Sequence, residues 1–216
     1  TLKIVHEYDI RIVQNEYINS STQKNWALKY CNYDWILQID SDEILENNAE
    51  TIIRESIHNV DDSIDCFRLA RKNHVLGKWI RYGGFYPDWE YRLFRKTSGQ
   101  WNEREVHAKV IVNGKTNDLN IHIIHHGMPN ISKQLGNINR YSRYEADEMI
   151  KAGVNFKFFK WIIGPILIFF KRYFLQLGFL DGWRGFFMAI YTSFYFFVSY
   201  TKLLEVRLLR LERSPQ

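Results

Sequence analysis

The chain has 216 residues, of which 46% are hydrophobic and 25% are charged, with a formal net charge of +5. This composition suits one sizeable packed domain, or one domain with an appended helical segment. Two cysteines, Cys31 and Cys66, exclude a disulfide framework and a cysteine metal motif and favour a reducing compartment. We expect no signal peptide, because the N-terminus lacks a charged start followed by an apolar run.

Aromatic residues and positive charge gather near the C-terminus. Residues 151–216 hold 18 of the 35 aromatic residues and ten Lys or Arg against three Asp or Glu. Such a segment predicts an anionic surface as partner, and a solvated basic face is the simpler alternative. We expect no nucleic-acid partner, because the cations lie among long apolar runs. The predicted organisation is a core domain over residues 1–150 and membrane-associating helices over residues 151–216.

The N-terminal part alternates between extended and helical patterns. Residues 10–13 form a short β-type stretch, and helical spacing over residues 22–30 begins with Thr22 as the expected N-cap. The apolar run at 35–39 is typical of a strand buried in a parallel sheet, and residues 49–58 are helical in pattern. This strand and helix order predicts a layered α/β core.

From Asp65 onward the pattern becomes extended, with glycine and proline punctuation. Strands are expected at 66–70, 89–95, 109–112 and 121–125. Helices are expected at 132–152, 155–173 and 181–212, with a break at Gly178. The uncharged runs of the last two helices are too short, or too diluted by Tyr, Ser and Thr, for a span of about 20 apolar residues. A monotopic anchor in the membrane interface is therefore favoured over a true span.

The acidic turn Asp40-Ser41-Asp42 follows directly after the apolar run. In open α/β sheets, ligands collect beyond the carboxyl ends of the strands. Two carboxylates flanking a small residue can meet one divalent cation, and Mg²⁺ or Mn²⁺ prefers such oxygen ligands. A capped turn without a metal is the structural alternative.

Several ordered motifs resemble a known enzyme family. The segment from Gln23 to Glu43, with its Asp40-Ser41-Asp42 turn, is similar to the middle of a family 2 glycosyltransferase. The stretch Gly77–Phe94 resembles the branch that builds lipopolysaccharide cores and related surface glycans, as do Val106-His107, His125-His126 and the run Gly178-Phe179-Leu180-Asp181-Gly182.

The resemblance implies a GT-A-like mixed sheet core, N-terminally truncated, that transfers a sugar from a nucleotide-diphosphate donor, usually with inversion. A UDP-sugar is the expected donor and a lipid-linked glycan the expected acceptor, at the cytoplasmic face of a bacterial inner membrane. Asp40 and Asp42 match the metal-binding motif. Asp88 matches the expected catalytic base, with Glu90 as the rival carboxylate and a turn residue as the structural alternative.

Further positions follow from the same resemblance. Lys24 corresponds to a donor-binding position, Trp89 could stack on a sugar ring, and Arg92 could hold Glu90 or reach a phosphate. His125 or His126 could join the metal shell. The alternative is a histidine that is hydrogen-bonded near the acceptor site. Each of these residues also has a structural interpretation, as a helix-surface, core or strand residue.

Three departures from the family pattern matter. Ala108 stands where relatives commonly have Glu, and Glu90 where they commonly have Gln. The strands that carry uracil-binding residues in relatives would precede Thr1, and we expect them in a longer natural protein. A non-catalytic membrane-surface scaffold with an incomplete fold is the main alternative. A metal-dependent phosphohydrolase or nucleotidyltransferase, which also uses paired aspartates, is a further one.

Overall fold

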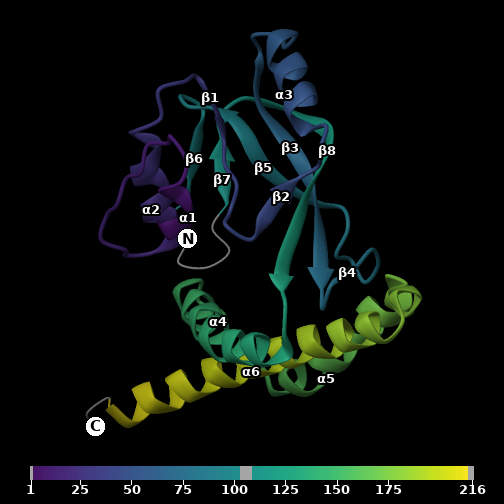
Figure 1. Cartoon of the computed structure of the whole chain (residues 1–216). Helices are drawn as coiled ribbons and strands as arrows, with labels where there is room; N and C mark the ends of the chain where they lie inside the picture. The colour runs from purple at the N-terminus through teal and green to yellow at the C-terminus, as the bar shows by residue number, and fades with distance from the viewer. Residues whose placement is uncertain (1, 103–108, 214–216) are drawn as a thin grey trace. The chain divides into compact units, whose positions relative to one another are not determined.

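The computed structural model describes residues 2–102 and 109–213 (Figure 1). The backbone forms two compact units, each assembled from separate stretches of the chain. Unit 1 comprises Thr1–Gln38, Val60–Phe67 and Tyr91–Asn117, and unit 2 comprises Ile39–Asn59, Arg68–Glu90 and Asp118–Gln216. The expected boundary after residue 150 therefore lies inside unit 2 and stays a prediction about membrane association.

One six-stranded sheet dominates the fold. Its order is β1-β5-β3-β8-β2, with β4 paired to β3. The three long strands, which continue from one unit into the other, are β3 (Ile64–Val75), β5 (Asp88–Arg95) and β8 (Lys115–Met128). The short strands are β1 (Trp35–Leu37), β2 (Glu43–Leu45) and β4 (Lys78–Trp79). Sheet and helices together confirm the α/β class.

Strand β1 corrects one expectation. It lies at the end of the sheet order and pairs with β5 in antiparallel register, with Ile36 opposite Phe94. Its apolar run had predicted a strand buried in a parallel sheet, yet Leu37 is 37% exposed. An antiparallel strand can leave one face open, so a short apolar run does not by itself reveal the direction of pairing.

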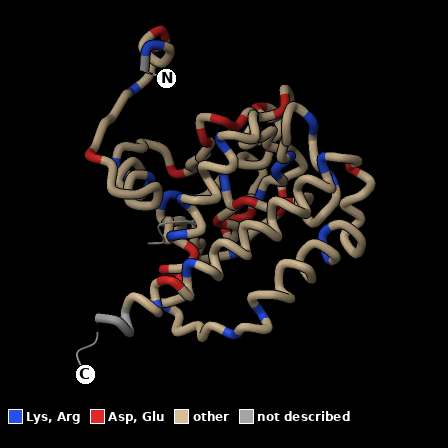
Figure 2. The backbone as a smooth tube through the Cα atoms, turned by 90° about the horizontal axis from the view of Figure 1, so that it is seen from below, with Lys and Arg blue, Asp and Glu red and all other residues tan. Residues whose placement is uncertain are grey.

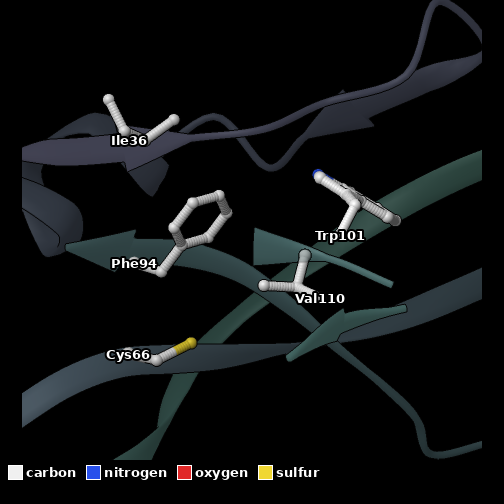
Figure 3. Packing of buried hydrophobic residues seen from close by; sticks show 5 residues of the cluster. All are labelled: Ile36, Cys66, Phe94, Trp101 and Val110. Atoms are coloured by element: carbon white, nitrogen blue, oxygen red, sulfur yellow. The ribbon is translucent and has the colours of Figure 1, made fainter. Parts of the chain in front are cut away.

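Unit 1 adds α1 (Leu2–Val5), α2 (Ser20–Leu28) and the hairpin of β6 (Gly99–Trp101) and β7 (Val110–Val112). The strand expected at 10–13 is wrong, since these residues pair with no strand of the described chain. The N-cap of α2 is Asn19 and not Thr22, because the Thr22 amide donates to Asn19 Oδ1 at 2.9 Å. The core of this unit is a cluster of Ile36, Cys66, Phe94, Trp101 and Val110 (Figure 3).

Unit 2 carries the other helices. The expected helix at 49–58 is confirmed as α3 (Ala49–His58), and that at 132–152 as α4 (Ile131–Lys151). Next come α5 (Phe158–Phe170), the π-helical turn η1 (Lys171–Leu175), the 3₁₀ turn η2 (Gly178–Asp181) and α6 (Trp183–Arg213). The break expected at Gly178 is confirmed, with Leu177 in the left-handed region at φ 57°. Both α4 and α5 pack on α6.

The turn between α5 and α6 holds the chain that leads into β5. The Asp181 carboxylate accepts the amide N–H groups of Arg81, at 3.0 Å, and Tyr82, at 2.8 Å. Arg184 donates to the carbonyl oxygens of Val75 and Leu76 at the end of β3. The C-terminal segment therefore fixes the loop between β3 and β5 from outside the sheet.

We predict that Asp181→Ala lowers the free energy of unfolding by about 1–3 kcal/mol, because two amide N–H groups lose their acceptor. Urea denaturation followed by circular dichroism measures the change. Asp9→Ala, at an exposed position of unit 1, is the control and should change stability by less than about 0.5 kcal/mol. Equal stability of the two variants would show that the Asp181 contacts contribute little.

Candidate active site

The partly buried guanidinium of Arg71 organises the polar centre of unit 2. Arg71 lies on β3, and its Nε and Nη2 donate to Asp88 Oδ2 at 3.0 and 2.8 Å. Its Nη2 also lies 3.1 Å from Glu90 Oε1, and its Nη1 lies 3.4 Å from Glu43 Oε1. One cation thus joins carboxylates from β5 and β2.

Burial and charge act on Arg71 in opposite directions. Burial works against its positive charge, but the carboxylates of Asp88 and Glu90 outweigh this effect and raise the pKa of Arg71. The Glu43 side chain is wholly buried, and the same cation lies beside it. Removal of Arg71 would leave three carboxylates close together without a counter-charge.

The Asp88 carboxylate has one oxygen held firmly. Its Oδ2 accepts from Arg71 and, at 2.8 Å, from Asn73 Nδ2. Within the described residues, no donor is recorded for its Oδ1, and the side chain is 32% exposed. The arrangement fixes the plane of the carboxylate and leaves the second oxygen available to accept a proton from a ligand hydroxyl.

Asn73 also orients His125. Since Asn73 Nδ2 donates to Asp88, its Oδ1 is the acceptor for His125 Nδ1–H, at 2.7 Å. The other ring nitrogen of His125, Nε2, lies 3.5 Å from Asp42 Oδ2. Glu43 on β2 stands opposite His125 on β8, and this register brings the acidic turn beside the histidine. A hydrogen bond that fixes the tautomer of an imidazole is typical of a metal-ligating histidine.

A metal ion fits between Asp42 and His125 only if a bound substrate supplies further ligands to it. Within the described residues, no group of three or more His, Cys, Asp or Glu is arranged to hold a metal. Asp42 and His125 supply two facing donor atoms. Because Mg²⁺ is commonly bound by one or two carboxylates together with substrate phosphates, two protein ligands are compatible with a cation that arrives with a nucleotide diphosphate.

A cavity of about 540 Å³ opens onto this network. Its volume falls within the range of small-molecule sites. One side of the cavity is lined by Asp42, Arg71, Asn73, Asp88 and His125. Residues of α4 line the other side. The cavity therefore brings together the carboxylate predicted as base and two residues predicted as metal ligands.

Not every predicted residue lines this cavity. Asp40 joins the network through its backbone, where its N–H donates to Glu43 Oε2 at 3.0 Å. Glu90 contacts Arg71 and is absent from the cavity lining within the described residues. The exposed Trp89 ring lies 5.4 Å from the guanidinium of Arg68.

The two basic donor-site candidates lie in unit 1. Lys24 Nζ lies 4.2 Å from the centroid of the Trp101 ring. Arg92 is 2% exposed and donates to Gln38, and Arg71 is an arginine that contacts Glu90. Their roles in donor binding stay predictions.

The other histidines separate into different settings. His126 donates its amide to the Asp42 carbonyl oxygen at 3.0 Å, and its ring lies 5.1 Å from that of His74. Burial and the neighbouring His126 lower the pKa of His74, which lines the cavity. His122 bonds Glu46 and Tyr86 in a separate network. His107 and Ala108 lie outside the described residues.

Sequence reasoning missed Arg71, Asn73 and Glu43, which position the predicted residues. A signal was present in the polar residues at alternate positions of β3. Arg71 and Asn73 interrupt a strand that is otherwise apolar at Leu69, Ala70 and Val75, and residues two apart in a strand share a face.

No known family profile matches the chain. The chain is 25% identical over 200 residues to the lipopolysaccharide core biosynthesis glycosyltransferase LpsC of Rhizobium meliloti, covering 92% of this chain and 74% of the relative. It is 26% identical over 220 residues to an uncharacterised glycosyltransferase of Rickettsia conorii, covering 95% and 76%. A Rickettsia typhi glycosyltransferase is 26% identical over 226 residues, covering 96% and 75%.

These relatives match the chain along nearly its whole length and agree in their named class. The resemblance stated from the sequence motifs is thereby confirmed: the chain is a homologue of bacterial glycosyltransferases and an enzyme of the transferase class.

Proposed function

We propose that this glycosyltransferase uses a divalent cation to transfer a sugar, with inversion, from a nucleotide diphosphate to a lipid-linked glycan of the cell envelope. The observation that carries the proposal is the Asp88 carboxylate, locked at Oδ2 and facing the same cavity as Asp42 and His125. The name of the R. meliloti relative supports a lipopolysaccharide-core glycan as the acceptor class.

In this mechanism Asp88 Oδ1 takes the proton of the acceptor hydroxyl while that oxygen attacks the anomeric carbon. The bond between the anomeric carbon and the diphosphate oxygen breaks, and the diphosphate leaves with the electron pair. Bound Mg²⁺ or Mn²⁺ would offset the charge that develops on this leaving group. Asp42 and His125 would hold the cation, and Arg71 and Asn73 keep the base in its orientation.

We predict that Asp88→Asn lowers the transfer rate by about 10²- to 10⁴-fold, because the general base is lost. Donor affinity should change little. Steady-state assays with a UDP-sugar and a membrane extract as acceptor source measure the rate, and calorimetry with UDP measures affinity. Asp118→Asn is the matched control, since Asp118 also pairs with an arginine, Arg68, at 2.7 Å but does not line the cavity.

The same assay applied to Glu90→Gln separates the two candidate bases. Full loss of transfer in Glu90→Gln, with activity retained in Asp88→Asn, would move the base to Glu90. A metal-dependent phosphohydrolase would keep its hydrolytic activity in both variants.

We predict that Mn²⁺ strengthens UDP binding by wild-type protein and that Asp42→Asn removes this dependence. The carboxylate supplies charge that an amide cannot match for a hard cation. Calorimetric titration of UDP with Mn²⁺ and with EDTA gives the two affinities, with Asp118→Asn as control. A Mn²⁺ effect of unchanged size in Asp42→Asn would remove Asp42 from the site.

The C-terminal helices supply the second part of the proposal, a phospholipid surface as partner. Within the described residues, no helix has both the length and the apolarity needed to cross a bilayer. Helix α5 has the sequence FFKWIIGPILIFF, and none of its residues is buried. Exposed apolar side chains continue through the following turn, where Leu175 is 80% exposed. An apolar surface of this extent marks an interaction site.

The charges on the same segment favour an anionic lipid surface over a protein partner. Figure 2 shows that Lys and Arg positions alternate with long uncharged stretches along the C-terminal helices. Aromatic pairs such as Trp161 with Phe197, 5.5 Å apart, hold α5 on α6. An amphipathic pair of helices with flanking cations suits the headgroup boundary. The thiols of Cys31 and Cys66 favour the cytoplasmic leaflet, which faces a reducing compartment.

We predict that Phe159→Glu with Leu175→Glu lowers binding to vesicles of phosphatidylcholine and phosphatidylglycerol by at least about tenfold, because each side chain loses apolar burial. Sedimentation measures the bound fraction. Ile18→Glu with Tyr33→Glu is the matched control, since these side chains of unit 1 are equally exposed, at 71% and 81%. Equal loss in both double variants would contradict a membrane surface on α5 and η1.

A further inference from the structure

The helical wall of the cavity carries a face that the proposed chemistry does not use. Five residues of α4 line the cavity, and they share one side of the helix: Lys133, Gln134, Asn137, Arg140 and Tyr141. Lys133 and Arg140 lie seven residues apart, which places them about 10 Å from each other along the helix axis. Two exposed cations and two amides thus line the cavity over two helical turns.

The charges of Lys133 and Arg140 are not offset as others on α4 are. Arg143 pairs with Asp147 at 3.5 Å, and Lys151 pairs with Glu148 at 3.3 Å. Arg140 Nη2 instead donates to neutral acceptors, Asn137 Oδ1 at 3.1 Å and Tyr141 Oη at 2.8 Å. In the described part of the chain, neither Lys133 nor Arg140 has a carboxylate partner.

The cavity wall that faces α4 carries carboxylates. Asp42 and Asp88 line it, and the one arginine among its residues, Arg71, is already paired with carboxylates. A ligand that spans the cavity would therefore present an anion to α4 and a hydroxyl to Asp88. Lysine and arginine recognise phosphate and carboxylate through charge-assisted hydrogen bonds.

We propose that the acceptor is an anionic saccharide whose phosphate or carboxylate binds Lys133 and Arg140, which orients its reactive hydroxyl toward Asp88. This inference rests on the proposed function, in which the donor diphosphate belongs to the wall of Asp42. The anion at α4 is therefore assigned to the acceptor. Asn137, between the two cations, adds a polar group that can bond a neighbouring sugar hydroxyl.

The test compares simple saccharides as probes. Glucose 6-phosphate, glucuronate and methyl glucoside are titrated by NMR into the full chain, and UDP with Mn²⁺ is titrated by calorimetry. We expect at least one anionic sugar to bind about tenfold more tightly than methyl glucoside. Lys133→Gln with Arg140→Gln should weaken that binding about tenfold or more, since charge-assisted contacts are lost, and should change UDP affinity less than about twofold.

The control is Arg143→Gln with Lys151→Gln, which removes two cations of α4 that do not line the cavity. It should leave both affinities unchanged. Equal binding of charged and uncharged sugars would overturn the proposal, and so would a loss of UDP affinity in the Lys133 and Arg140 variant, which would assign these cations to the donor. A failed metal role of Asp42 shows itself separately, as UDP binding that does not depend on Mn²⁺.

Discussion

The site depends on one partly buried cation, Arg71, whose charge is balanced by surrounding carboxylates. Arg71 contacts Asp88, Glu90 and Glu43, which come from β5 and β2, while Arg71 itself comes from β3. The carboxylates offset the cost of removing the guanidinium from water, and the guanidinium does the same for the wholly buried Glu43. Ion pairs between side chains therefore join the strands that frame the cavity, in addition to their backbone hydrogen bonds.

This constraint determines which atoms remain for chemistry. Because Arg71 and Asn73 occupy Asp88 Oδ2, the oxygen that can serve a ligand is Oδ1. Because Asn73 also accepts from His125 Nδ1, the nitrogen directed at Asp42 is Nε2. Asn73 thus links the two halves of the proposed mechanism, the base and the cation ligands, through a single amide whose oxygen and nitrogen both have assigned partners.

The sequence predicted elements where local pattern decides structure. Helix α3 has the expected bounds because its apolar residues recur with helical spacing. Asp42 Oδ2 lies 3.5 Å from His125 Nε2, and the metal role of these two residues stays a prediction. The sequence did not reveal the antiparallel pairing of β1, which depends on a distant strand. The sequence did not indicate the role of Arg71 for a similar reason. Its role comes from three carboxylates that the fold brings together across 47 residues of chain, from Glu43 to Glu90.

The turn formed by η2 and the start of α6 connects the helices proposed to bind lipid with the loop that precedes the candidate base. Asp181 accepts the Tyr82 N–H, and Arg184 donates to the Val75 carbonyl oxygen. The two side chains therefore hold the segment that precedes Asp88 at two points. Truncating the C-terminal helices would therefore remove contacts that hold the loop before Asp88 along with the proposed lipid-binding surface. An experiment that separates the proposed lipid binding from turnover therefore calls for substitutions at exposed side chains of α5, with the contacts of Asp181 and Arg184 kept.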